Sequence, residues 1–204
     1  MDDDSGTRAR LLEAAGEVFA GRGFQAATVK EICQRAKANI AAVNYHFRDK
    51  HSLYVEVLRY TSQRAREKYA TQNPDPAFAP EERLREYVQK FMLRILDTGR
   101  PAWHGKLLAR EMVEPTAALD ELVKDAVVPN MKALEGIVRE LLGAKSSAET
   151  IRLTAHSIIG QCLYYSHARP VLERLTPKPD YSEKGVEHLA AHIADFSLAA
   201  LRRA

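Results

Sequence analysis

Residues 27–50 read ATVKEICQRAKANIAAVNYHFRDK, and they contain two short helical patterns joined by a tight connection. Thr28 is expected to be an N-cap, and Glu31, three residues later, would complete a capping box. The first short helix is predicted over residues 28–36 and the second over residues 39–47. Two short helices joined in this way are typical of a helix-turn-helix.

Longer helices are predicted on both sides of this segment. Before it, the apolar residues Leu11, Ala15 and Phe19 repeat at i+4, and Gly21-Arg22-Gly23 is expected to end that helix. After it, Asp49 is placed to cap another long helix. The pattern therefore predicts an N-terminal helical domain in which the helix-turn-helix is supported by longer neighbours.

The second short helix must bury one side and leave another free. Ile40, Val43 and Phe47 recur at i, i+3 and i+7, so they are expected to share the buried side. The remaining residues are left for the other sides, where small side chains permit close approach to a ligand: Asn39, Ala41, Ala42, Asn44, Tyr45 and His46.

The polar residues among these have the chemistry to contact DNA. Asn44 has the amide geometry for an adenine edge. Tyr45, His46 and Thr28 can donate to phosphates, and Lys50 is expected to reach a phosphate as a point charge. Tyr45 packed on its neighbours, and His46 acting only as a cation at a helix C-terminus, are the alternatives.

The charge is distributed unevenly along the chain. Residues 1–70 hold 12 Lys/Arg and 9 Asp/Glu, a net +3, whereas residues 71–204 hold 18 of each. Three of the N-terminal acids are Asp2, Asp3 and Asp4. A basic module attached to a neutral body suggests that the module faces a polyanion.

The segments Leu11–Ala15, Phe19–Phe24, Ala27–Ile32 and Asn44–Lys50 together resemble the TetR family of bacterial regulators. The resemblance implies a homodimer that places one recognition helix per subunit in successive major grooves. Where that family often has glycine, this chain has Lys37. A left-handed turn there would cost about 1 kcal/mol, and the lysine would add a phosphate contact.

Beyond the first domain, all regular structure is predicted to be helical. Prolines 74, 76 and 80 mark a boundary, which divides the chain into a DNA-binding domain, 6–70, and an effector-binding and dimerisation domain, 71–204. The fold class is thus all-α. Helices are predicted at 81–98, 102–113, 116–143, 147–169 and 183–203, with Pro129 interrupting the third.

The second domain carries many apolar residues, some of which are candidates for an effector cavity, although a core role is the main alternative for each. Glu111 and its neighbour Arg110 could orient a polar effector. Residues 109–118 also resemble a subgroup similar to the regulator CecR, whose members repress genes for export pumps and related membrane functions. The candidate ligand-binding residues are Phe91, Ile95, Trp103, Leu107, Arg110, Glu111, Ile158, Cys162 and Tyr165.

The last two predicted helices have apolar residues on broad faces, which suggests a partner helix. The resemblance implies that these helices form a four-helix dimer interface. The candidate dimerisation residues are Ile159, Leu163, Leu189, Ile193 and Phe196. His188 and His192 share one face at i, i+4, but no third ligand is evident, so interface or surface histidines are favoured over a metal site.

No nucleophile elbow, phosphate-binding glycine loop or metal triad is present, which argues against an enzyme, and no cofactor is expected. No apolar run is long enough to span a membrane, and the acidic N-terminus does not resemble a signal peptide, so a cytoplasmic protein is expected. The leading hypothesis is a repressor that a small-molecule effector releases from double-stranded operator DNA. The alternative is an architectural or protein-partnered DNA-binding regulator without such a ligand.

Overall fold

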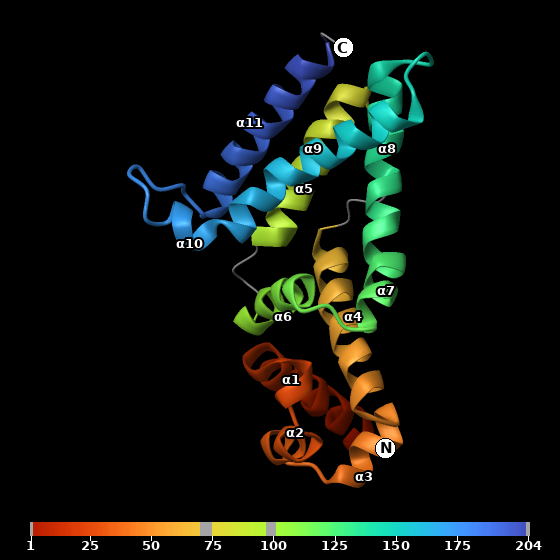
Figure 1. The fold of residues 1–204 in the computed structure, drawn as a ribbon, viewed down its shortest axis with the longest axis vertical. Coiled ribbons are helices and arrows are strands. Elements are labelled where there is room, and N and C mark those ends of the chain that lie inside the picture. Colours follow the sequence, from red (N-terminus) through yellow and green to blue (C-terminus); the bar gives the residue numbers. More distant parts are fainter. Residues whose placement is uncertain (1, 70–74, 97–100, 203–204) are drawn as a thin grey trace. The chain divides into compact units, whose positions relative to one another are not determined.

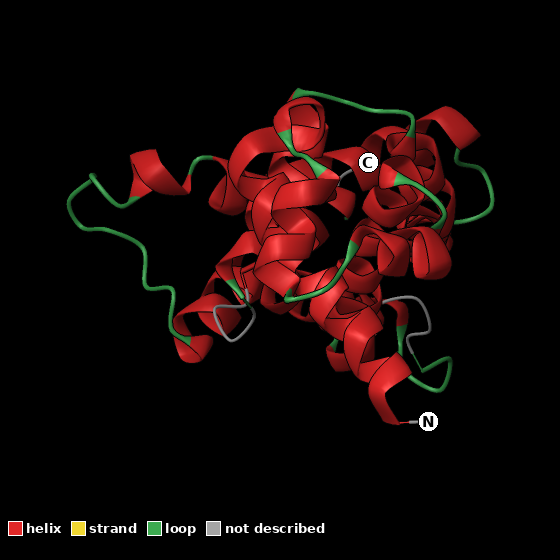
Figure 2. Ribbon diagram, turned by 90° about the horizontal axis from the view of Figure 1, so that it is seen from below, coloured by secondary structure: helices red, strands yellow, loops and turns green. Residues whose placement is uncertain are grey.

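The computed structural model describes residues 2–69, 75–96 and 101–202. Over these residues, every regular element is a helix (Figure 2), which confirms the predicted all-α class. The chain divides into two compact units. The first unit consists of Met1–Arg64 and Thr98–Ala126, and the second of Ala65–Asp97 and Val127–Ala204.

The first unit is built on the predicted helix-turn-helix and its flanking helices (Figure 1). A break interrupts its first helix at Gly23, whose backbone has φ 78° and ψ 167°, so the predicted glycine stop is confirmed. Only glycine adopts such a conformation without strain. The helices of this unit are α1 (Asp2–Ala26), α2 (Val29–Ala36), α3 (Ile40–Phe47), the greater part of α4 (Lys50–Lys68), α6 (Ala102–Val113) and α7 (Ala118–Leu122).

The core of the first unit is apolar and partly aromatic. Phe19 of α1 and Tyr54 of α4 meet edge to face, with ring centroids 4.8 Å apart, and Phe24 lies 5.0 Å from Tyr54. Ile32 of α2 and Val43 of α3 are fully buried in the same cluster. The i, i+4 apolar series of the sequence therefore forms the surface on which both short helices pack.

Helix α6 belongs to this core, although it follows the proline-rich segment in the sequence. Leu107 is fully buried, and the Trp103 ring lies against Gly16 of α1. A Cβ atom added at Gly16 would stand 2.2 Å from the Trp103 ring. Glycine at this position thus creates the notch that the indole fills.

The two-unit division differs from the one predicted at residues 70 and 71. Those two residues, with Pro74 of the proline-rich stretch, lie outside the described residues. The segment Thr98–Ala126 joins the N-terminal unit instead of the C-terminal one. The predicted division therefore remains a prediction. The site is described below in terms of the two compact units.

The second unit packs four long helices and one short helix around its own core. Tyr87, Met92, Leu134 and Ala155 are all buried in that core. Within the described residues no helix is long and apolar enough to cross a membrane. The helices are α5 (Pro80–Leu96), α8 (Val128–Leu142), α9 (Ala148–His167), α10 (Arg169–Leu172) and α11 (Glu183–Leu201).

The predicted interruption at Pro129 is confirmed. Pro129 lies in the first turn of α8, and the π-helical turn η1 (Val123–Val127) comes directly before it. Proline has no backbone N–H to donate to the carbonyl four residues earlier, so the regular α-helical ladder cannot continue unchanged through this point.

Candidate nucleic-acid interface

Local hydrogen bonds fix the turn between α2 and α3. The Thr28 hydroxyl accepts the backbone N–H of Glu31 at 3.2 Å, as the predicted N-cap requires. Lys37 ends α2 in the left-handed conformation, with φ 52° and ψ 46°. Asn39 then caps α3, because its Oδ1 accepts the N–H of Ala42 at 2.8 Å.

Lys37 adopts the left-handed backbone conformation at the position where the family often has glycine. The turn keeps its conformation with a lysine in place, although a side chain is strained there. The N–H of Ala38 donates to the Cys33 carbonyl at 2.9 Å and helps to close the turn. The Lys37 side chain is exposed beside α3 and is available to an anionic partner.

Helix α3 buries one side and exposes the opposite one. Val43 is fully buried and Phe47 is 3% exposed. Ile40, Ala41, Asn44 and Tyr45 are exposed, and their i, i+1, i+4, i+5 spacing places them on one continuous side of the helix. Such an exposed side is what a recognition helix presents to the major groove.

One sequence prediction for α3, the burial of Ile40, is wrong. Ile40 is 53% exposed instead of buried with Val43 and Phe47, because it lies in the first turn, before the part of α3 that packs on the core. Ala42 is half-buried and packs against the core of the first unit, and its predicted approach to DNA stays a prediction. Spacing alone does not show where the supporting helices end.

Lys50 occupies a different place from the predicted phosphate contact. Its ammonium donates to the carbonyls of Phe24 at 2.8 Å, Ala27 at 3.0 Å and Gln25 at 3.4 Å. It also lies 4.5 Å from the centroid of the Phe24 ring. Since an ammonium has three donors, Lys50 is committed to holding the end of α1 against the start of α4.

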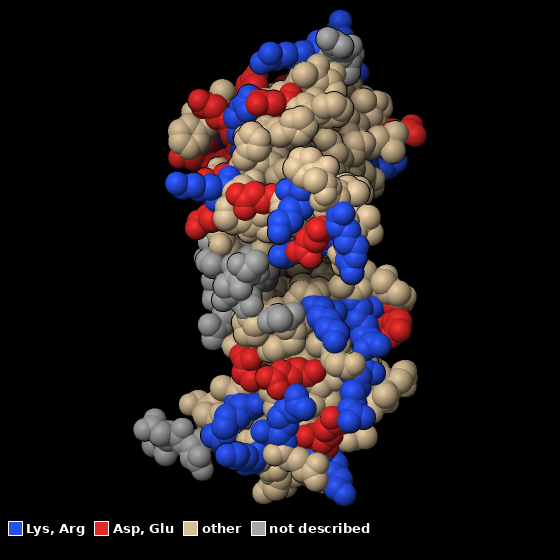
Figure 3. Space-filling model, turned by 90° about the vertical axis from the view of Figure 1, so that its left-hand side faces the viewer, with Lys and Arg blue, Asp and Glu red and all other residues tan. Residues whose placement is uncertain are grey.

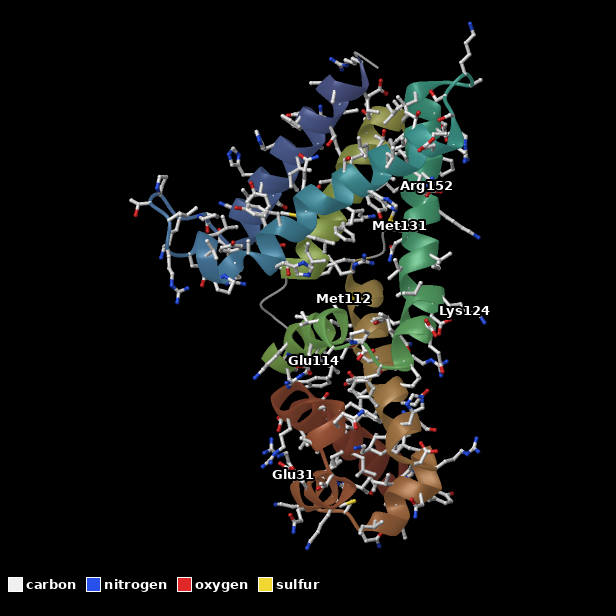
Figure 4. The ribbon with its side chains drawn as sticks, in the orientation of Figure 1. Glu31, Met112, Glu114, Lys124, Met131 and Arg152 are labelled. Atoms are coloured by element: carbon white, nitrogen blue, oxygen red, sulfur yellow. The ribbon has the colours of Figure 1, made fainter. Side chains whose placement is uncertain are left out.

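Other cations of this unit differ in the partners that they have. Several arginines pair with glutamates within the unit. Arg22 of α1, for example, lies 2.9 Å from Glu31 of α2, which is labelled in Figure 4. Lys30, Lys37 and Arg48 are exposed and form no ion pair among the described residues. Figure 3 shows lysine and arginine side chains gathered over the end of the unit where α1 and α2 lie.

The start of α4 is fixed by polar contacts as well as by its core. Asp49 caps it as predicted, accepting the N–H of Ser52 at 2.7 Å, and this backbone hydrogen bond lowers the pKa of Asp49. One turn later, the Tyr54 hydroxyl donates to Oε2 of the fully buried Glu111 at 2.5 Å. The other oxygen of Glu111 accepts the N–H and hydroxyl of Thr116 at 2.8 and 2.9 Å.

The predicted effector-binding residues are divided between the two units. Phe91, Ile158 and Cys162 are buried in the core of the second unit, with Ile95 and Tyr165 packed against it. The other four lie in the first unit and have structural partners there. Trp103 packs on Gly16, Leu107 lies in the core, and Glu111 accepts from Tyr54. Arg110 lies 3.5 Å from the Gly21 carbonyl and 3.1 Å from Glu114, which is labelled in Figure 4.

Sequence reasoning did not identify a polar group inside the second unit. Asn130 of α8 is 7% exposed; its carbonyl accepts the Tyr87 hydroxyl at 3.1 Å, and its side chain accepts Arg94 at 3.2 Å. The Arg94 guanidinium also lies 4.9 Å from the centroid of the Phe91 ring. The charge of Arg94 within the apolar run of residues 91–96 was the available signal.

The predicted dimerisation residues differ in how far they are exposed. Phe196 of α11 is 61% exposed, whereas Ile193 is 2% exposed and packs in its own unit's core, so Ile193 is corrected from an interface residue to a core residue. Ile159, Leu163 and Leu189 are partly buried against that core. Leu153 and Tyr164 of α9 are 56% and 54% exposed, and the sequence analysis did not name them.

Histidine and cysteine side chains are the groups on which metal binding or redox chemistry would depend. No group of three His, Cys, Asp or Glu side chains there could hold a metal ion, and His188 and His192 are exposed on α11. Cys33 and Cys162 are both free and buried, and burial raises the pKa of each thiol.

Two family models match the chain and together span most of it. Residues 11–57 match the bacterial regulatory proteins of the tetR family. Residues 80–201 match the C-terminal domain of the HTH-type transcriptional dual regulator CecR. The first match contains the helix-turn-helix, and the second begins at α5 and ends with α11.

Comparison with individual proteins agrees with these matches. The HTH-type transcriptional repressor NicS of Pseudomonas putida is 34% identical, covering 97% of this chain and 93% of its own. CecR of Shigella flexneri is 26% identical, covering 87% and 83%. The solved structure of HlyIIR, a hemolysin II transcriptional regulator, has a TM-score of 0.63 at 23% identity, covering 93% and 97%, and supports the fold.

A helix-turn-helix with one exposed side on its second helix, joined to a second helical unit, defines a DNA-binding transcriptional regulator. The chain belongs to the TetR family, with a C-terminal part of the CecR type. Members of this family are regulators and not enzymes, and they bind operator DNA as dimers.

Proposed function

We propose that this protein is a homodimeric repressor that a small molecule releases from operator DNA. The observation that carries the DNA-binding part is the exposed side of α3, formed by Ile40, Ala41, Asn44 and Tyr45 opposite the buried Val43. Because side chains on this side are not needed for the core, they are available to base edges and phosphates.

Within that interface, the residues are assigned different roles. Asn44 reads an adenine through its amide. Phosphates or sugars are contacted by Thr28, Tyr45 and His46. Asn39 contributes its amide nitrogen, because the cap of α3 uses only its amide oxygen. Lys37 contacts a phosphate, and we assign the same role to Lys30 and Arg48 because both are exposed.

The dimer is assigned to the outer faces of α9 and α11. Leu153, Tyr164 and Phe196 expose more than half of their surface there. Gly160 has no neighbouring atom within 4 Å of an added Cβ, so a partner helix could approach closely at that point. Covering such residues with the same faces of a second copy would bury a large apolar area.

The effector is assigned to the second unit. Its core contains Phe91, Ile158 and Cys162 beside the polar group of Arg94 and Asn130, which suits a ligand with an apolar body and one polar end. Trp103 and Glu111 are not assigned to this site, since each has a partner in the first unit. The ligand must bind the released state several kcal/mol more tightly to act as a switch.

Selection of genomic fragments by the purified protein tests this proposal. A palindromic fragment that binds far more tightly than random DNA is the expected result, and the affinity should fall steeply with salt. Equal, weak binding to all fragments would contradict operator recognition. A specific site that no small molecule releases would favour the alternative of a protein-partnered or architectural regulator.

The variant Asn44→Ala sharpens the same test. It should weaken binding to the selected fragment by about tenfold or more while leaving random DNA almost unaffected. Lys30→Ala should instead weaken both and lower the salt slope by about one. Equal losses for both kinds of DNA in Asn44→Ala would exclude Asn44 as a base reader.

A further inference from the structure

Ile40 is exposed at the position where a recognition helix enters the groove. Its side chain is 53% exposed in the first turn of α3, and in helix-turn-helix proteins it is the N-terminal residues of this helix that contact base edges. This branched side chain is therefore not buried in the core of the first unit. An aliphatic group at such a position has one favourable partner on a base edge, the 5-methyl group of thymine.

The neighbours of Ile40 on the exposed side narrow the choice of bases. The Ala41 side chain is a methyl group with no hydrogen-bond donor, and Asn44 carries an amide suited to adenine. This side of α3 contains no arginine or lysine, the side chains that most often read guanine. Its chemistry is therefore complementary to A·T pairs.

The spacing of these two readers matches base pairs that lie about two steps apart. Ile40 and Asn44 are separated by one helical turn, about 6 Å along the axis. Base pairs are stacked about 3.4 Å apart. Two side chains on one face at this separation reach bases that lie within about two steps of each other.

The backbone around Ile40 holds it in this place. Asn39 caps α3 through the Ala42 N–H at 2.8 Å, and the Cys33 thiol donates to the Asn39 carbonyl at 3.4 Å. Val43, three residues later, is fully buried. The first turn is thus anchored on both sides of Ile40, and its side chain is presented without a loop that must become ordered first.

We infer that Ile40 is a specificity residue that contacts a thymine methyl group, and that each operator half-site contains this thymine within two base pairs of the adenine read by Asn44. The inference rests on the proposed operator binding. It goes beyond that proposal by stating which bases the half-site must contain and which side chain reads the methyl group.

Replacement of thymine by uracil tests the inference, because it removes only the methyl group and keeps the base pair. Each thymine of a selected operator is replaced in turn, and affinity is measured by fluorescence anisotropy at one salt concentration. The expected result is a loss of about three- to tenfold at one thymine per half-site. Ile40→Ala should bind the thymine and uracil duplexes equally at that position.

Two further variants serve as controls. Ile40→Val keeps a branched methyl and should retain part of the discrimination, whereas Val113→Ala changes an 80% exposed aliphatic residue outside α3 and should leave the uracil profile unchanged. Two results would overturn the role of Ile40 while leaving the proposed function intact. One is a selected operator whose affinity changes at no thymine when uracil replaces it, and the other is the same pattern of losses in Ile40→Ala as in the wild type. The absence of any preferred fragment would overturn the proposed function and this inference together.

Discussion

The Tyr54 hydroxyl donates a 2.5 Å hydrogen bond to the carboxylate of Glu111, which is fully buried. Burial raises the pKa of the Tyr54 hydroxyl well above its usual range, and the hydrogen bond to Glu111 adds to this, so the hydroxyl stays protonated as a donor. Glu111 is also bonded to Thr116 after α6. These contacts join the helix that follows the recognition helix to α6.

Tyr54→Phe should lower the free energy of unfolding by roughly 1.5–3 kcal/mol, because a buried carboxylate oxygen loses its donor. Urea denaturation followed by the fluorescence of Trp103, the single tryptophan, measures the change in this unit. Tyr45→Phe is the matched control: Tyr45 is 76% exposed, and the change should stay within about 0.5 kcal/mol. Equal small effects in both variants would show that the Tyr54 hydrogen bond adds no stability.

Gly16→Ala should destabilise the first unit by about 1–3 kcal/mol, since the new methyl group would overlap the Trp103 ring. Thermal unfolding monitored by circular dichroism provides the measurement. Gly105→Ala on α6 is the control, because nothing lies within 4 Å of the added Cβ, and better helix propensity should stabilise it by up to about 1 kcal/mol. A destabilisation shared by both variants would argue against the notch.

Lys37→Gly should increase the free energy of unfolding by up to about 1 kcal/mol, because glycine relieves the left-handed strain at φ 52°. The same variant should weaken DNA binding and lower the salt slope by about one. Lys37→Ala separates the two effects, since it removes the charge and keeps the strain. If Lys37→Gly weakens DNA binding and Lys37→Ala does not, backbone flexibility rather than charge is responsible.

Phe196→Asp should dissociate the dimer at micromolar concentration, because it places a charge within the proposed apolar contact. Sedimentation velocity gives the oligomeric state. Val113→Asp, at a residue 80% exposed at the end of α6, should leave the dimer intact. A Phe196→Asp protein that sediments like the wild type would place the interface elsewhere.

Both thiols should be unreactive in the native protein at pH 8. Burial raises the pKa of Cys162 to about 12, which leaves about one thiolate in ten thousand at that pH. Since the thiolate is the reactive form, labelling of Cys162 in a Cys33→Ser variant should accelerate about tenfold per pH unit from 8 to 10. Ellman's reagent reports the rate, and rapid stoichiometric labelling at pH 8 would contradict this burial.

Local signals made most of the fold predictable. Thr28 and Asp49 form the caps that their side chains favour, and Gly23 breaks α1 where a stop was expected. Pro129 interrupts its helix because of its missing N–H. Each of these features depends on a residue and its neighbours within one or two turns, so the sequence carries the information directly.

The errors concern contacts between elements distant in sequence. Lys50 was expected to face a phosphate, but its carbonyl partners come from residues 24–27, and only the folded chain brings them to its ammonium. Sequence patterns likewise did not predict that Trp103 packs on Gly16 or that Glu111 accepts from Tyr54, because these partners lie far earlier in the chain. Apolar periodicity does not specify which of two cores a helix joins.

The docking of Trp103 on Gly16 has a consequence for engineering chimeric regulators. Because residues 98–126 complete the core that carries α2 and α3, the DNA-reading part of this protein is encoded by two separate stretches of chain. A hybrid made with a single crossover near residue 70 would pair one parent's notch with the other parent's indole. A graft that transfers residues 1–64 together with 98–126 would keep the matched surfaces in one parent and allow a new sensor to be installed around them.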